Sequence, residues 1–142
     1  MEQVKIYLSG GMCGLTFEQQ SGWRNRLQKA ITYNREPLKN PIFFSPPNFY
    51  CPTLPKAYKS EKEVMEFDLY NLRNSDIVVV NFNAPNSIGT AMELMMAKEN
   101  HIPVIGLNEN GVELHPWLIE CCTRMCDTFT ELVDHVVDFY LK

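Results

Sequence analysis

Two carboxylates in the sequence occupy places that suit chemistry in a cleft. Glu93 is expected on the first turn of a helix that follows a valine-rich strand, and Asp68 lies among apolar residues of another expected helix. Tyr7 belongs to the first expected strand, near the same edge of a sheet. Two carboxyl groups and a tyrosine around one cleft suit cleavage of a glycosidic bond, because one carboxylate can attack or stabilise the anomeric carbon while the other handles a proton.

Each of these three residues also has a purely structural interpretation. Thr90 and Glu93 have the spacing of a capping box, so Glu93 can simply cap its own helix. Asp68 can lie on a solvated helix face, and Tyr7 can be a packed residue of a core strand. From spacing alone, the sequence indicates only an α/β domain with a candidate acidic cleft.

The elements that must position these side chains alternate between strand and helix about five times. Apolar and β-branched runs predict strands at 4–8, 41–44, 76–81, 102–107 and, more weakly, 123–126. Helices are expected from Thr16, over 60–73, from about 88 to 100, near 116–122 and over 128–140. This alternation predicts a single α/β domain over 1–142, with a five-stranded, mostly parallel sheet covered by helices on both faces.

Ligands of such sheets bind beyond the carboxyl ends of the strands, where the loops 9–15, 82–87 and 107–115 should meet. Gly10 and Gly11 permit close approach of the backbone to a ligand. A dinucleotide fingerprint is excluded, because Ser9 stands where its first glycine is required. No P-loop sequence is present, and the first strand does not end in the carboxylates of a phosphoacceptor domain.

The stretch from 45 to 60 is longer than an ordinary connection and is rich in proline and aromatic residues, among them Phe49, Tyr50 and Tyr58. Loops of this length are often functional. A packed surface loop is an equal alternative, and the sequence leaves both open.

Composition narrows the functional classes further. The 142 residues are 45% hydrophobic and 21% charged, which is ordinary for a globular protein, and the net charge of −4 argues against general nucleic-acid binding. No apolar run approaches the ~18 residues of a membrane span. Five cysteines without an expected signal peptide predict reduced thiols in the cytoplasm. They include no C-x-x-C pair, so no metal site is expected.

Four segments together resemble the nucleoside 2-deoxyribosyltransferase family, including the related nucleoside 5′-monophosphate N-glycosidases. They are KIYLSGGM at 5–12, EFDL at 66–69, SDIVVV at 75–80 and SIGTAMEL at 87–94, of which the G-x-x-x-E-L part is the most specific. The resemblance implies a flavodoxin-like three-layer sandwich. It also implies an enzyme that cleaves the bond between base and sugar, with no cofactor and no metal.

The resemblance also implies catalytic roles. Glu93 matches the nucleophile that forms a deoxyribosyl ester at C1′, Asp68 matches the carboxyl that binds the base and assists its proton transfer, and Tyr7 matches the tyrosine that holds the nucleophile. Attack by a second base on the same side gives net retention, whereas attack by water makes the enzyme a hydrolase. We expect Glu93 to be kept ionised by its helix N-terminus and Asp68 to be kept protonated by its apolar neighbours.

Ser87 separates two substrate classes within this resemblance. Transferases that act on free nucleosides often have an aspartate six residues before the nucleophile, which binds the sugar 5′-hydroxyl. The monophosphate N-glycosidases have a serine there, which can donate to a phosphate. Ser87 therefore favours 5′-monophosphates, although it can equally be a plain helix-start serine.

Further binding residues are expected on the loops and on a neighbouring subunit. Ser9, Gly10, Gly11 and Gly89 are expected to line the sugar or phosphate site. His115 and Thr123 lie in the region that a neighbouring subunit contributes in the family. The resemblance thus implies a homo-oligomer, at least a dimer, with shared sites and with neither a nucleic-acid polymer nor a membrane as partner.

The predicted function is deoxyribosyl transfer between nucleobases of 2′-deoxynucleosides. The alternative is hydrolysis of (deoxy)nucleoside 5′-monophosphates to free base and sugar phosphate. A nucleotide sensor without turnover is a third hypothesis, and the intact set of Tyr7, Asp68 and Glu93 argues against it. The sequence leaves base preference and exact oligomeric state open.

Overall fold

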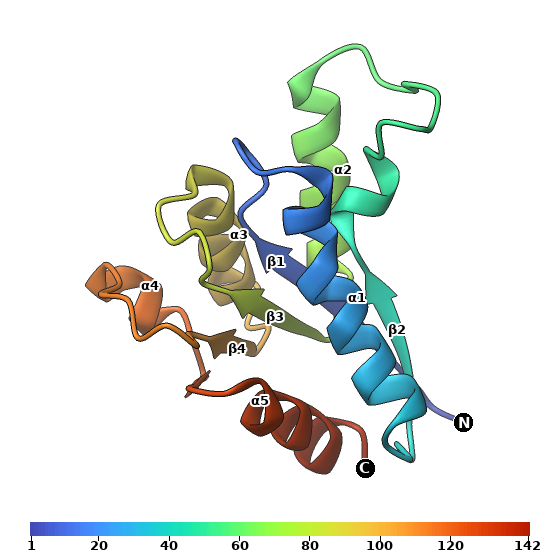
Figure 1. Cartoon of the computed structure of the whole chain (residues 1–142), viewed down its shortest axis with the longest axis vertical. Coiled ribbons are helices and arrows are strands. Elements are labelled where there is room, and N and C mark those ends of the chain that lie inside the picture. Colours follow the sequence, from blue (N-terminus) through green and yellow to red (C-terminus); the bar gives the residue numbers. More distant parts are fainter.

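The computed structural model describes all residues, 1–142, and contains one five-stranded sheet with helices on both faces (Figure 1). The strands are β1 (Gln3–Gly10), β2 (Asn40–Phe44), β3 (Ile77–Asn81), β4 (Val104–Leu107) and β5 (Arg124–Cys126). Their order in the sheet is β2-β1-β3-β4-β5, and every neighbouring pair is parallel. This is the flavodoxin-like order, so the predicted fold class is confirmed.

The helices begin where the sequence predicts their caps. They are α1 (Phe17–Tyr33), α2 (Glu61–Arg73), α3 (Ile88–Glu99), α4 (Pro116–Glu120) and α5 (Phe129–His135), with a 3₁₀ turn η1 (Pro46–Phe49). The predicted capping boxes of α1 and α2 are both formed. The last helix differs from the prediction, because regular α-helix stops at His135 and the chain continues to Tyr140 as a π-helical turn, η2 (Val136–Tyr140).

Two cores lie on opposite faces of the sheet. Helices α1 and α5 bury one face, where Leu27 and Leu132 join Ile6 and Val79 in one cluster. Helices α2 and α3 belong to the other face, whose cluster is Tyr7, Leu72, Val78, Val80, Phe82, Leu94, Ala97, Val104 and Leu114. Because successive strand residues point to opposite faces, the side chains of Tyr7 and Ser9 point to the α2–α3 side.

Close packing of two loops shapes the carboxyl edge of the sheet. A Cβ on Gly11 would lie 2.6 Å from the Cβ of Ala84 and 3.7 Å from that of Ser87. Gly10 is similarly crowded, since its Cβ would lie 3.1 Å from the ring of Trp23. Packing therefore explains both glycines, whether or not a ligand approaches them: Gly11 lies against the β3–α3 loop and Gly10 against helix α1.

Two further features bear on the class of protein. No helix is long and apolar enough to cross a membrane. All five cysteines are free thiols, and Cys126 is the buried one.

Gly11→Ala should destabilise the protein by about 1–3 kcal/mol, because the added methyl group overlaps the side chain of Ala84. Gly22→Ala is the matched control, since its Cβ would meet nothing nearer than 3.9 Å within α1. That change should stabilise by roughly 0.5–1 kcal/mol. Chemical denaturation of both variants tests the difference, and an unchanged stability of Gly11→Ala would contradict the packing argument.

Candidate active site

Glu93 does not cap its helix. The N-cap of α3 is Ser87, whose hydroxyl accepts a hydrogen bond from the amide of Thr90 at 3.2 Å. The Thr90 hydroxyl is buried without a hydrogen-bond partner, so the capping-box interpretation of Thr90 and Glu93 is wrong. Because α3 begins at Ile88, Glu93 lies on its second turn and not on the expected first turn.

The Glu93 carboxylate contacts the end of strand β1 instead. The Tyr7 hydroxyl donates to one carboxylate oxygen, and the Ser9 hydroxyl donates to the other at 2.8 Å. Tyr7 and Ser9 are both fully buried. Tyr7 therefore has the contact that the resemblance implies, whereas Ser9, expected to bind sugar or phosphate, holds the carboxylate of Glu93.

Burial dominates the electrostatics of Glu93. It raises the pKa of this carboxyl to about 7, against the opposing effects of the hydrogen bonds from Tyr7 and Ser9. Burial and the neighbouring Glu93 also raise the pKa of Tyr7, so its phenol stays protonated and able to donate. Burial therefore leaves Glu93 only partly ionised at neutral pH. Its place on the second turn of α3 lies beyond the first turn, where a helix N-terminus stabilises a carboxylate.

Asp68 lies on α2 and is partly buried. Its Oδ1 accepts a hydrogen bond from the Tyr50 hydroxyl at 2.7 Å. Burial raises the pKa of Asp68 to about 6, against the effects of this hydrogen bond and of the charge on Arg24. Asp68 is thus not a solvated surface residue. Its pKa shifts in the expected direction, but a value of about 6 leaves it mostly ionised at neutral pH and not protonated as expected.

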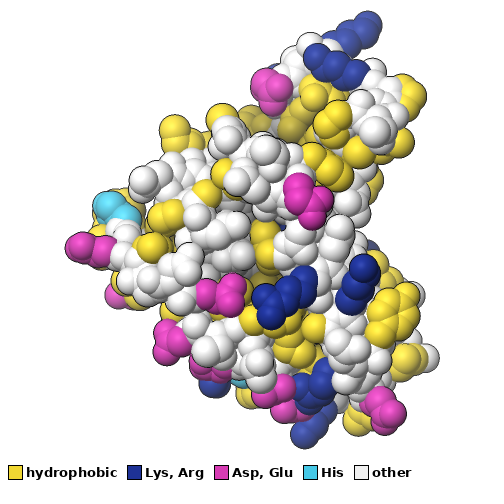
Figure 2. All heavy atoms as spheres, in the orientation of Figure 1, with side chains coloured by type: hydrophobic (Ala, Val, Ile, Leu, Met, Phe, Trp, Pro, Cys, Tyr) yellow, Lys and Arg dark blue, Asp and Glu magenta, His cyan; other side chains and the backbone are white.

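Aromatic side chains of β2, the proline-rich stretch and α2 pack on one another. Phe44, at the end of β2, stacks on Tyr7 at 5.2 Å between ring centroids and on Phe49 at 4.9 Å. Phe49 in turn meets Phe67, the neighbour of Asp68, at 5.2 Å. Phe49 and Phe67 remain 49% and 40% exposed. Hydrophobic side chains also gather on the projecting end of the molecule in Figure 2, where α2 and the loop before it lie in Figure 1. These exposed rings suit the stacking of a flat aromatic ligand beside a carboxyl group.

Arg24 is a part of the site that the sequence analysis missed. Its side chain is fully buried, and its Nε and Nη2 donate to the carbonyls of Leu8 and Gly10 at 3.1 and 3.2 Å. Burial lowers its pKa only to about 10, so it stays charged. A signal was present in the sequence, because Arg24 shares the helix face of Leu27 and Ile31, where an apolar residue is expected.

The remaining predicted residues are placed as follows. Ser87 lies beside Gly11 at the start of α3, and Gly89 is exposed with open space around it. His115 is the exposed N-cap of α4, where its Nδ1 accepts from the amide of Trp117 at 3.1 Å. Thr123 is not brought to Glu93, since its hydroxyl accepts from the amide of Val104 at the amino edge of the sheet.

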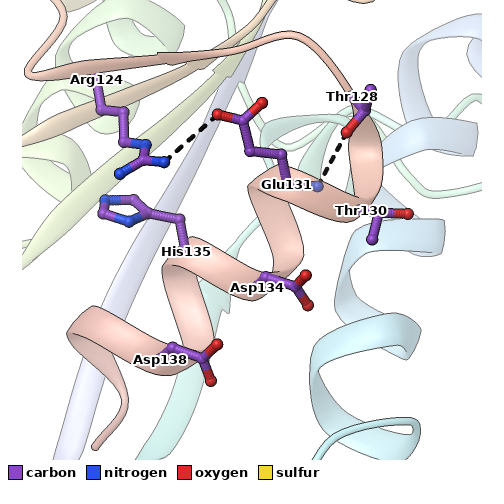
Figure 3. A pocket seen from close by; sticks show the side chains of 7 residues that line it. All are labelled: Arg124, Thr128, Thr130, Glu131, Asp134, His135 and Asp138. Carbon is purple, nitrogen blue, oxygen red and sulfur yellow. Dashed lines mark hydrogen bonds and ion pairs between the residues drawn. The ribbon is translucent and has the colours of Figure 1, made fainter.

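A hollow lined by residues of β5 and α5 lies away from the residues around Glu93 (Figure 3). Its charged groups have partners within the chain, since Arg124 pairs with Glu131 and the two aspartates pair with Arg35. The lining residues are Arg124, Thr128, Thr130, Glu131, Asp134, His135 and Asp138. None of these groups forms a nucleophile–base pair, and the catalytic candidates remain those around Glu93.

Comparisons with known proteins identify the fold. No family model and no curated protein matches the sequence. Among solved structures, a conserved protein from Enterococcus faecalis V583 superposes with a TM-score of 0.75 at 17% identity, covering 94% of this chain and 97% of its own. A 2-deoxyribosyltransferase from Bacillus psychrosaccharolyticus gives 0.73 at 16% identity, with coverages of 92% and 91%.

A nucleotide N-glycosidase also shares the fold, at a lower TM-score. The CMP N-glycosidase BcmB from Clostridium botulinum superposes with a TM-score of 0.55 at 12% identity, covering 93% of this chain and 97% of its own. The chain thus has the fold of these enzymes, as the resemblance implied.

Glu93→Gln should stabilise the protein at neutral and alkaline pH. The pKa of Glu93 is raised in the folded state, so its contribution to stability is present in acid and is lost as pH rises through about 7. The melting temperature of the wild type should therefore fall more steeply between pH 5 and 8 than that of the variant. Glu63→Gln is the control, because hydrogen bonds from backbone amides lower the pKa of Glu63. Parallel curves for wild type and Glu93→Gln would contradict the shift.

Proposed function

We propose that this protein cleaves the N-glycosidic bond of a 2′-deoxynucleoside and transfers the deoxyribosyl group to another nucleobase. The observation that carries the proposal is the Glu93 carboxylate, held by the hydroxyls of Tyr7 and Ser9 while Asp68 stands on the adjacent helix α2. The fold shared with the 2-deoxyribosyltransferase of Bacillus psychrosaccharolyticus supports it.

The chemistry assigns one role to each carboxyl group. The Glu93 carboxylate attacks C1′, the bond from C1′ to the base nitrogen breaks, and Asp68 gives its proton to the departing base. A second base then attacks C1′ and displaces Glu93 while Asp68 takes up the proton, with net retention. The pKa of Glu93, about 7, lies above that of Asp68, about 6, so a single proton shared by the two groups is mostly on Glu93 before the reaction. Moving this proton to Asp68, which frees the Glu93 carboxylate to attack, costs about 1.4 kcal/mol.

The surroundings of Asp68 support a nucleobase as the departing group. The exposed rings of Phe49 and Phe67 contact each other, and Phe67 is the residue before Asp68 in α2. Stacking on such rings contributes about 1–3 kcal/mol per base. A ligand with no flat aromatic part would leave these rings without a partner.

A second candidate function is hydrolysis of a nucleoside 5′-monophosphate. It is favoured by Ser87, an uncharged residue beside Gly11 at the N-terminus of the twelve-residue helix α3. Helix N-termini favour anions, and a serine at this place does not repel a phosphate. The fold shared with a CMP N-glycosidase supports this candidate.

Two parallel incubations test the proposal, one with 2′-deoxyadenosine and one with its 5′-monophosphate, each with and without free cytosine. Transfer predicts a deoxycytidine peak by chromatography only when cytosine is present. Adenine released from the monophosphate irrespective of cytosine would instead support the hydrolase. Glu93→Ala should abolish either activity, because the nucleophile is gone, and Glu99→Ala at the exposed C-terminal end of the same helix should retain it. Full activity of Glu93→Ala would overturn the covalent mechanism.

We further propose that the protein is a homo-oligomer in which subunits adjoin near the site. Large apolar side chains are exposed along one stripe of α3, at Ile88, Met92 and Met95, and on α4, at Trp117 and Ile119. Patches of this kind mark interaction surfaces. Light scattering should give at least twice the mass of the 16.4 kDa chain. A monomer at micromolar concentration would refute the assembly.

A further inference from the structure

Arg24 is the only charged side chain among the fully buried residues. Removing a charge from water is costly unless it is paired and hydrogen-bonded. No carboxylate lies within ion-pair distance of this guanidinium, which donates instead to three backbone carbonyls. An apolar residue would fill this core position without the free-energy cost of desolvating a charge. The buried charge therefore indicates a specific role for Arg24.

The hydrogen bonds of Arg24 are concentrated on the residues either side of Ser9. Nε donates to the carbonyl of Leu8 and Nη2 to that of Gly10, while Nη1 donates to the carbonyl of Gln20 within α1. The guanidinium therefore fixes the β1 backbone immediately before and after Ser9. A rigid, planar fork of donors is suited to fixing two carbonyls at once.

The charge of Arg24 also acts on the catalytic candidates. The ionisable groups whose charges interact with it are Glu93, Asp68 and Tyr7. Its positive charge lowers the pKa of Glu93 and of Asp68, opposing the effect of their burial. Without it, both carboxyl groups would hold their protons to higher pH.

We propose that Arg24 is a positioning residue of the active site, which fixes Ser9 against Glu93 and places a positive charge across strand β1 from the two carboxylates. The inference rests on the proposed function. It adds a third layer to the site: Glu93 reacts, Ser9 and Tyr7 hold Glu93, and Arg24 holds Ser9.

The pH profile of kcat/KM is the first test. Below about 6 both carboxyl groups are protonated and no nucleophile is present, and above about 7 no proton is left for the departing base. The wild type should give a bell between these values. Arg24→Met should move both limbs to higher pH, by about one unit, and lower the maximum by roughly ten- to a hundredfold.

The matched control is Arg26→Met on the same helix. Arg26 is exposed and covers the ring of Phe129 at 3.8 Å, so this change also removes an arginine that packs on its neighbours. It should leave the profile in place and change kcat/KM by less than about twofold. Arg24→Lys retains a cationic donor and should recover part of the activity lost in Arg24→Met. It also keeps the test decisive if the Met variant fails to fold.

A double-mutant cycle with Ser9→Ala tests the route of action. If Arg24 acts through Ser9, its replacement should cost several-fold less activity in the Ser9→Ala background than in the wild type. Independent, multiplying losses would overturn the positioning role of Arg24 through Ser9.

A carboxyl titration separates failure of this inference from failure of the proposed function. The pKa of Glu93 is measured by carbon NMR of glutamate-labelled protein, with the resonance assigned from Glu93→Gln. It should rise in Arg24→Met and stay in place in Arg26→Met, whatever the substrate is. A wild type inactive on every nucleoside and nucleotide would refute the function alone. An unmoved Glu93 pKa in folded Arg24→Met would overturn the role of Arg24.

Discussion

The carboxylate of Glu93 is withdrawn from water between helix α3 and the end of strand β1, and the local structure is built around its requirements. A buried carboxylate needs hydrogen-bond donors, because desolvation disfavours its charge. Tyr7 and Ser9 provide two, one to each oxygen. They can do so because they are two positions apart on one strand and therefore point to the same face.

This arrangement leaves the carboxyl group near the midpoint of its titration at neutral pH. Four influences compete: burial and Asp68 raise the pKa of Glu93, whereas the hydroxyl donors and Arg24 lower it. Burial is the largest of them, so the result is a pKa of about 7. In the proposed transfer reaction Glu93 must act both as nucleophile and as leaving group, and a group that titrates near the working pH is suited to such a reaction.

Local rules account for most of the fold. Alternating strands and helices, the capping boxes at Thr16 and Ser60, and the fully buried β3 follow from patterns of a few residues each. The start of α3 is not determined by local rules alone, because Ser87 and Thr90 both suit an N-cap. Ser87 is the N-cap in the structure, and the Glu93 side chain accepts hydrogen bonds from two residues of β1 instead of capping the helix.

The parts of the site that the sequence did not reveal all depend on contacts between distant segments. Residue type and spacing single out Glu93, Asp68 and Tyr7 as candidates, and the family resemblance assigns a role to each. The orientation of Ser9, the clamp formed by Arg24 and the contact of Tyr50 with Asp68 have no local signature beyond a charge on an apolar helix face. Each joins elements whose relative placement only the folded chain determines.

The Tyr50 contact has a consequence for the direction of proton transfer. Burial raises the pKa of Tyr50, and the hydrogen bond to Asp68 raises it further. This phenol therefore remains a donor at neutral pH. It donates to Oδ1 of Asp68, which must therefore act as an acceptor. A proton carried by Asp68 is consequently placed on Oδ2, the oxygen left free for a ligand. The aromatic loop thus orients the Asp68 carboxyl group, and the packing of Phe49 on Phe44 and Phe67 ties that orientation to the same strand edge that holds Glu93.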